Sequence, residues 1–241
     1  IMPLPKINTP TYEMELPSSG KKVKYRPFLV KEEKILLIAL ETEDMKQISD
    51  GLIQILNNCI ITRGIKVQSL ATFDIEYLFL NVRARSVGET VEVQLSCPDD
   101  GETTVDVEID IDSIKVQKSK EHKNIIKLDD AYSMKLKYPS FEQFIGNNFE
   151  IDDDVSDVTK SLDMITSCID VVYDKEESFN ASECSKEEIT DFVDRLNSKQ
   201  FKEIEKFFET MPKLSHTVKV KNPNTNVESD VVLEGLASFF S

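Results

Sequence analysis

Hydrophobic and polar residues alternate in several short segments of the chain, which is the pattern of strands that bury one face. Three pairs of these segments are separated by polar turns, and each pair predicts an antiparallel hairpin. The pairs are residues 12–16 with 21–28, 91–95 with 105–111, and 216–220 with 227–233. Short strands are also predicted at 125–126 and 132–138, while the rest of 112–130 is expected to be loop.

Elsewhere hydrophobic residues recur every three or four positions, the spacing that places them on one face of a helix. Such segments begin near Val30, Met45, Thr72, Ser140, Val155, Ser185 and Ser198. We expect Thr72 to cap its helix, and residues 155–172 predict one long amphipathic helix. Residues 35–40 are apolar on almost every side, so that helix is expected to be buried against several neighbours. The pattern as a whole predicts an α+β fold, in which a helical core carries several antiparallel β-hairpins.

The order of these elements predicts three segments along the chain. Residues 1–29 form an N-terminal arm and hairpin, and residues 30–149 form a helical segment with a β-hairpin. Residues 150–241 form a C-terminal helical segment that ends in a hairpin and an aromatic tail. The three segments can equally belong to one continuous domain.

Two of the hairpin turns have a similar composition. Residues 97–101 read Cys-Pro-Asp-Asp-Gly, and residues 222–226 read Asn-Pro-Asn-Thr-Asn. Both resemble the CPxCG turn of a zinc ribbon, but Cys97 is the only sulfur ligand that they retain, whereas structural zinc needs about four nitrogen or sulfur ligands. The turns therefore predict either degenerate zinc-ribbon-like hairpins that fold without metal or ordinary hairpin turns, and no cofactor is expected.

The chain is acidic, with 44 Asp and Glu against 29 Lys and Arg, which gives a formal net charge of −15. This balance argues against direct binding of nucleic acid, which needs clustered basic residues. No apolar run approaches the roughly 20 residues that cross a bilayer, so no membrane partner is expected. The four cysteines are scattered and form no CxxC motif, so their pattern does not indicate disulfides or an oxidising compartment. Synthesis in the cytoplasm is therefore expected.

The residue types that carry catalysis are sparse. His122 lies in a charged segment and is expected to be solvated, whereas His216 begins a strand and is expected to be partly buried. No nucleophile elbow, zinc-protease, phosphate-loop, kinase or dinucleotide-binding motif is present. An enzyme would have to assemble a Cys–His pair from Cys97 or Cys184 through the fold, and no spacing indicates one. We therefore expect no enzymatic activity.

The N-terminal hairpin carries a basic cluster in this acidic chain. Lys22, Lys24 and Arg26 occupy alternate positions and would share one face of a strand. That face is either a solvated surface or an interaction edge for an acidic partner.

Residues 16–28 read LPSSGKKVKYRPF, and the helix entry that follows reads VKEEK at residues 30–34. With the C-terminal segments at 211–216 and 233–240, they resemble a family of baseplate proteins from T4-type contractile-tailed bacteriophages. The resemblance implies a non-enzymatic structural or assembly component of the baseplate hub, made in the host cytoplasm and located in the tail of the virion. Its partners would be other hub or wedge proteins, with several copies in a symmetric assembly.

The residues expected to contact partners lie in the N-terminal hairpin and in the C-terminal tail. They are Lys22, Lys24, Arg26, Phe28, Leu236, Phe239 and Phe240. The aromatic tail could equally cap the protein's own core. Two alternatives to a hub subunit remain open: an assembly chaperone that leaves before the virion matures, and an acidic mimic of nucleic acid.

Overall fold

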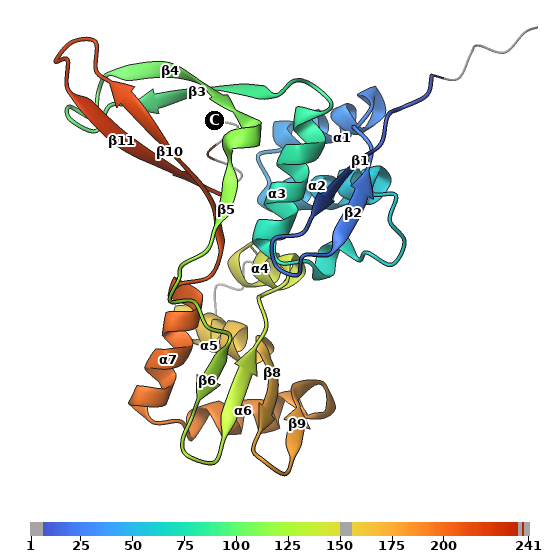
Figure 1. Ribbon diagram of the computed structural model, residues 1–241, viewed down its shortest axis with the longest axis vertical. Helices are drawn as coiled ribbons and strands as arrows, with labels where there is room; N and C mark the ends of the chain where they lie inside the picture. Colours follow the sequence, from blue (N-terminus) through green and yellow to red (C-terminus); the bar gives the residue numbers. More distant parts are fainter. Residues whose placement is uncertain (1–6, 150–155, 236–237, 239–241) are drawn as a thin grey trace, which may run out of the picture. The chain divides into compact units, whose positions relative to one another are not determined.

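The computed structural model describes residues 7–149, 156–235 and 238 (Figure 1). The chain forms two compact units. Unit 1 consists of Ile1–Gln117 with Lys213–Ser241, and unit 2 consists of Lys118–Pro212. The boundaries of these units differ from the three segments expected from the sequence, whose division stays a prediction.

Unit 1 combines helices with three small antiparallel sheets. Its helices are α1 (Val30–Glu41), α2 (Met45–Cys59) and α3 (Thr72–Ala84). Its strands are β1 (Tyr12–Glu15), β2 (Lys22–Tyr25), β3 (Thr90–Ser96), β4 (Thr104–Asp110), β5 (Lys115–Gln117), β10 (Lys213–Lys221) and β11 (Glu228–Glu234). The sheets pair β1 with β2, β3 with β4, and β11 with β10 and β5, all antiparallel.

Unit 2 contains one four-stranded antiparallel sheet, in the order β6-β7-β8-β9. Its strands are β6 (Ile125–Lys127), β7 (Ser133–Leu136), β8 (Ile169–Tyr173) and β9 (Ser178–Asn180). Its helices are α4 (Phe141–Phe149), α5 (Asp157–Ser167), α6 (Lys186–Asp194) and α7 (Ser198–Glu209). Helices and antiparallel sheets in both units confirm the predicted α+β fold. Among the described helices, none has the length and apolar composition that crossing a bilayer requires.

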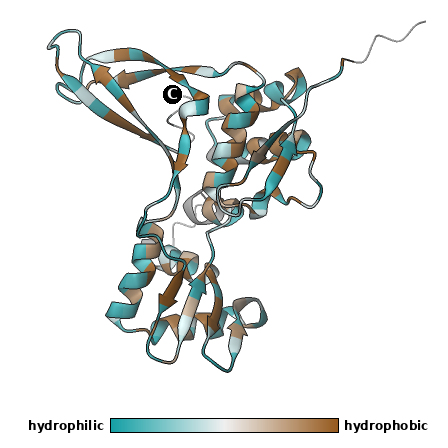
Figure 2. Ribbon diagram, in the orientation of Figure 1, coloured by the Kyte–Doolittle hydropathy of each residue, from teal (hydrophilic) through white to brown (hydrophobic). Residues whose placement is uncertain are grey.

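The core of unit 1 explains why its strands alternate. Val91, Val93 and Leu95 on β3 are buried, as are Val218 and Val220 on β10. These residues belong to one hydrophobic cluster, which Leu80 and Ala84 of α3 join. Hydrophobic residues therefore alternate with polar ones along both hairpins (Figure 2), because only one face of each is covered.

Most elements begin where the sequence predicts, and local capping explains this. Ser185 and Glu188 form a capping box at the start of α6, and Ser140 exchanges hydrogen bonds with Gln143 at the start of α4. The expectation for Thr72 was wrong, since the N-cap of α3 is Ala71 and Thr72 is the first helical residue.

The predicted long helix at 155–172 was wrong in its C-terminal part. The helix α5 ends at Ser167, and β8 begins at Ile169. Val172 pairs with Met134 of β7 on one side and with Phe179 of β9 on the other. Branched side chains at 169, 171 and 172 suit a strand, but their spacing also fits a helix, so strand pairing decided the conformation. The short strands β5 and β9 were not predicted.

Candidate interaction surfaces

The predicted contact residues of the N-terminal hairpin do not share one exposed face. Lys22 and Lys24 on β2 are exposed, and the Lys22 ammonium lies 3.4 Å from the carboxylate of Glu13 on the paired strand. Arg26 is only 18% exposed, and Phe28 is buried. The structure therefore corrects the expectation of a three-residue basic face, because the two lysines are exposed and Arg26 is mostly buried.

The side chain of Arg26 points to a buried carboxylate instead. Its Nη2 donates to Oε1 of Glu32 at 3.0 Å, and its Nη1 donates to the carbonyl of Pro27 at 2.9 Å. Glu32 is fully buried and also accepts a hydrogen bond from the amide of Leu29. Burial alone would raise the pKa of the Glu32 carboxyl, but the bonds from Arg26, Leu29 and Lys31 hold that pKa below its usual value.

Phe28 contributes to the interior of unit 1 rather than to a surface. Its side chain is 8% exposed, and its amide donates to Oγ of Ser86 at 2.9 Å. Its predicted contact with a partner stays a prediction, with little surface left to make it. The other predicted contacts, Leu236, Phe239 and Phe240, lie outside the described residues.

The helix α1 presents an exposed apolar face, which contradicts the expectation that it is buried against several neighbours. It packs on α2, where Ala39 and Ile35 approach Gly51 closely. On the opposite side Val30 is 65% exposed, Leu37 55% and Ile38 64%. Positions separated by seven and eight residues lie on one side of a helix, so these three side chains face the same way, with the charged Lys34 between Val30 and Ile38 along the helix. We call these residues, with the neighbouring exposed Leu40, the α1 face.

The two proline-containing turns, which are more than 120 residues apart in the sequence, contact each other. The side-chain amide of Asn222 donates to Asp99 at 3.1 Å and to Asp100 at 2.8 Å. The hydroxyl of Thr225 donates to Asp99 at 2.5 Å. The hydrogen bonds from Thr225 and Asn222 hold the pKa of Asp99 below its usual value. Bonds from Thr103, in the same turn as Asp100, act with the bond from Asn222 to lower the pKa of Asp100 in the same way.

The paired turns do not suit a structural zinc ion. The four positions where CPxCG turns carry cysteines are occupied by Cys97, Asp100, Asn222 and Thr225, so the donors are one thiol, one carboxylate, one amide and one hydroxyl. Burial and the two nearby carboxylates raise the pKa of the Cys97 thiol, which disfavours the thiolate that binds metal. Across the described residues, no three His, Cys, Asp or Glu side chains group as a metal site would require.

The two histidines have no cysteine partner among the contacts of the described residues. The expectation of a solvated His122 was wrong, since its ring nitrogens lie 3.1 Å from Oγ1 of Thr210 and 3.0 Å from Oη of Tyr138. Its ring also lies against Phe207, with centroids 5.1 Å apart. Burial and the charge of Lys118 lower the pKa of His122. His216 lies half-buried on β10, as expected.

Comparison with known protein families matches residues 9–241 to the family described as T4 bacteriophage base plate protein. This match covers nearly the whole chain. The chain belongs to that family. It is therefore a component of a phage tail base plate with a structural or assembly role. No curated protein and no solved structure matched the chain.

In this base plate protein the residues that carry the family resemblance are largely structural. Arg26, Phe28 and Glu32 of the RPF and VKEEK segments bind one another or pack inside unit 1. The exposed α1 face was missed because its residues are as hydrophobic as those of a core helix. A signal in the sequence is the run of polar residues at 41–44, which directly follows the apolar part of the helix.

Proposed function

We propose that this protein is a non-enzymatic component of the base plate hub that acts by binding other hub or wedge proteins. The α1 face carries this proposal. Leu37, Ile38 and Leu40 are large apolar side chains exposed close together on one helix, and clusters of this kind mark protein interaction sites more often than single exposed apolar residues do. Membership in a base plate family supports a protein as the occupant of this face.

The side chains with catalytic potential support a role without enzymatic activity. Both ring nitrogens of His122 have partners, and Cys59, Cys97 and Cys168 are buried. Burial raises the pKa of Cys59 and of Cys168 to about 11, so neither thiol is an activated nucleophile at neutral pH. The exposed thiol is Cys184, and neither histidine is among its hydrogen-bond partners in the described residues.

The proposal includes the cellular route of the protein. It would be synthesised in the host cytoplasm and joined there to the growing base plate, in several copies set by the symmetry of the particle. Shape complementarity at the α1 face would supply affinity, and the acidic surface would favour basic partner patches.

The test replaces exposed apolar residues of the α1 face in the phage that encodes this protein. We expect the double variant Leu37→Ser and Ile38→Ser to reduce infectious particles by about tenfold or more, with base plates arrested at an intermediate density, since apolar anchors dominate interface energy. The matched control is Val232→Ser, an equally exposed valine on β11. Wild-type assembly by the double variant would overturn the role of the α1 face.

Quantitative mass spectrometry of purified virions separates the two forms of the proposal. A hub subunit would be present at a fixed ratio to other base plate proteins. If the protein is absent from virions while assembly still depends on the α1 face, it is an assembly chaperone instead.

A further inference from the structure

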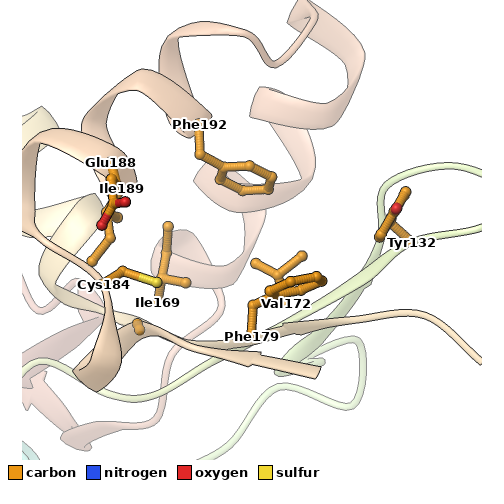
Figure 3. A pocket seen from close by; sticks show the side chains of 9 residues that line it. Tyr132, Ile169, Val172, Phe179, Cys184, Glu188, Ile189 and Phe192 are labelled. Carbon is orange, nitrogen blue, oxygen red and sulfur yellow. The ribbon is translucent and has the colours of Figure 1, made fainter. Parts of the chain in front are cut away.

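An apolar pocket of about 370 Å³ opens in unit 2 between α6 and the sheet. Phe192 of α6 lies on one side, and Val172 of β8 and Phe179 of β9 lie on the other (Figure 3). Ile169 and Ile189 complete the apolar lining. The pocket is large enough for a bulky side chain and lies at the lower end of the usual size of small ligand sites.

The wall on the β9 side is open to solvent. Phe179 is 47% exposed, although it is a large aromatic residue, and Tyr132 at the rim is 40% exposed. The strand β9 is at the edge of its sheet, and its three residues are all exposed. An edge strand beside an apolar pocket is the arrangement in which an extended peptide is bound by strand addition.

The surroundings of the pocket are strongly acidic. Residues 174–194, which supply much of its wall, carry eight Asp or Glu and only two Lys. One of these lysines, Lys186, pairs with Asp163 at 3.1 Å. Glu188 lines the pocket itself, and Glu187 and Asp191 are exposed on α6, where Asp191 also pairs with Arg195 at 2.7 Å. Hydrogen bonds from backbone amides lower the pKa of Asp174 and of Glu187, so both are charged at neutral pH.

We propose that this pocket binds a segment of another base plate protein in which one large apolar side chain is flanked by lysine or arginine. The apolar side chain would enter between Phe179 and Phe192, and the basic residues would lie against the carboxylates of α6. Removing the apolar side chain from water supplies affinity, and the opposite charges supply orientation and selectivity. That the partner is a base plate protein rests on the proposed function; the chemistry of the segment rests on the pocket alone.

A second copy of this chain would not offer its most basic segment. In the hairpin that contains Lys22, Lys24 and Arg26, Tyr25 and Phe28 are buried, and the half-buried Tyr12 stacks on Tyr25. No aromatic anchor of that hairpin is therefore free to enter the pocket, and we assign the occupant to a different chain.

The binding test uses the full chain and a short tryptophan peptide, because the chain has no tryptophan and every tryptophan signal then comes from the peptide. The probe is acetyl-Lys-Lys-Trp-Lys-Lys-amide. One control peptide replaces each Lys by Glu. The other replaces Trp by Gly and is tested unlabelled, as a competitor of the probe. We expect saturable binding of the probe with a blue shift of its emission, weakening as salt rises. Equal binding of the glycine peptide, or no binding of the probe, would overturn the proposal.

Variants of the chain locate the site. Phe179→Ser, at an exposed position, and the double variant Glu187→Lys with Asp191→Lys should each weaken probe binding about tenfold. The charge control is Glu92→Lys with Glu108→Lys, two exposed glutamates paired across β3 and β4 in unit 1. Circular dichroism would confirm that each variant is folded. An equal loss of probe binding in the control variant would show that binding follows net charge, and would overturn the assignment of the binding site to this pocket.

Cys184 provides an independent readout, because it lines the pocket and is the exposed one of the four cysteines. Saturating probe should slow its reaction with a thiol reagent at least several-fold, and an unchanged rate would contradict occupancy of the pocket. The α1 face takes no part in these measurements. If α1 variants lose assembly but the chain does not bind the probe, the pocket inference is rejected and the α1 proposal stands. If the chain binds the probe but α1 variants assemble normally, the α1 proposal is rejected and the pocket inference stands.

Discussion

The side-chain amide of Asn222 donates a 2.8 Å hydrogen bond to the carboxylate of Asp100, across 122 residues of sequence. Asn222 is fully buried, and its Oδ1 also accepts from the amides of Asn224 and Thr225. One side chain therefore shapes its own turn and joins that turn to the turn between β3 and β4. In a ribbon a metal ion would make such a junction, whereas here polar side chains make it.

Replacing Asn222 by Ala should destabilise unit 1 by about 1–3 kcal/mol, since the change leaves buried or partly buried polar groups without a partner. Urea unfolding followed by circular dichroism measures this cost. The control is Gln94→Ala, which removes one exposed hydrogen bond to Asp106 and should cost less than about 0.5 kcal/mol. Equal costs would contradict a joining role for Asn222.

The same junction predicts an acid dependence. Because the folded pKa values of Asp99 and Asp100 are lowered, the unfolded chain takes up their protons first as pH falls. Their stabilising effect is thus complete well above about pH 4, the unfolded value, and is lost as pH falls toward the folded values. In Asn222→Ala, the unfolding midpoint should depend less on pH below 4. An unchanged pH dependence of the unfolding midpoint would contradict the role of Asn222 in stabilising the charged forms of Asp99 and Asp100.

The buried carboxylate of Glu32 makes Arg26 a sensitive position. Arg26→Ala would leave Glu32 buried with fewer partners and should cost about 3 kcal/mol in the unfolding of unit 1. The control is Lys22→Ala, which removes an exposed ion pair and should cost less than about 1 kcal/mol. Adding Glu32→Gln to Arg26→Ala should restore part of the loss, because it removes a buried charge whose nearest remaining cationic partner is the exposed Lys31.

The contact between α1 and α2 depends on the absence of a side chain at Gly51. A Cβ there would lie 3.2 Å from Cβ of Ala39 and 3.6 Å from Cγ2 of Ile35. Gly51→Leu should therefore separate the helices and cost about 1–3 kcal/mol. Gly51→Ala should change stability little, because a helix-propensity gain of about 1 kcal/mol offsets the crowding. Thermal unfolding of both variants tests this. A Gly51→Leu variant as stable as the wild type would contradict the close packing of α1 on α2.

His122 predicts a pH dependence for unit 2 near neutrality. Burial and Lys118 lower its folded pKa below the unfolded value of about 6.5. The unfolded state then binds the proton first, so this contribution is complete above pH 6.5 and is lost as pH falls toward the folded pKa. Proton NMR of the two histidines, assigned with His216→Gln, should show His122 titrating below 6.5. Titration above 6.5 would contradict its buried position.

The local elements of this protein follow from short stretches of its sequence. Period-two alternation predicted the three hairpins, and capping boxes such as Ser185 with Glu188 predicted where helices begin. Hairpins and helix starts depend on residues that are close in the sequence, so each segment contains the information that specifies its own conformation. The family resemblance also came from the sequence, through residues that prove to be largely structural.

Strand pairing and burial depend on residues that are distant in the sequence, so they are set by the tertiary structure. Residues 169–172 fit a helix by spacing and became a strand because β7 and β9 pair with them. Leu37 and Ile38 are exposed because α1 packs mainly on α2 among the described elements. His122 is half-buried because Tyr138 and Phe207 lie against it. Burial and strand pairing are set by which surfaces meet, and hydrophobic pattern alone does not specify that choice.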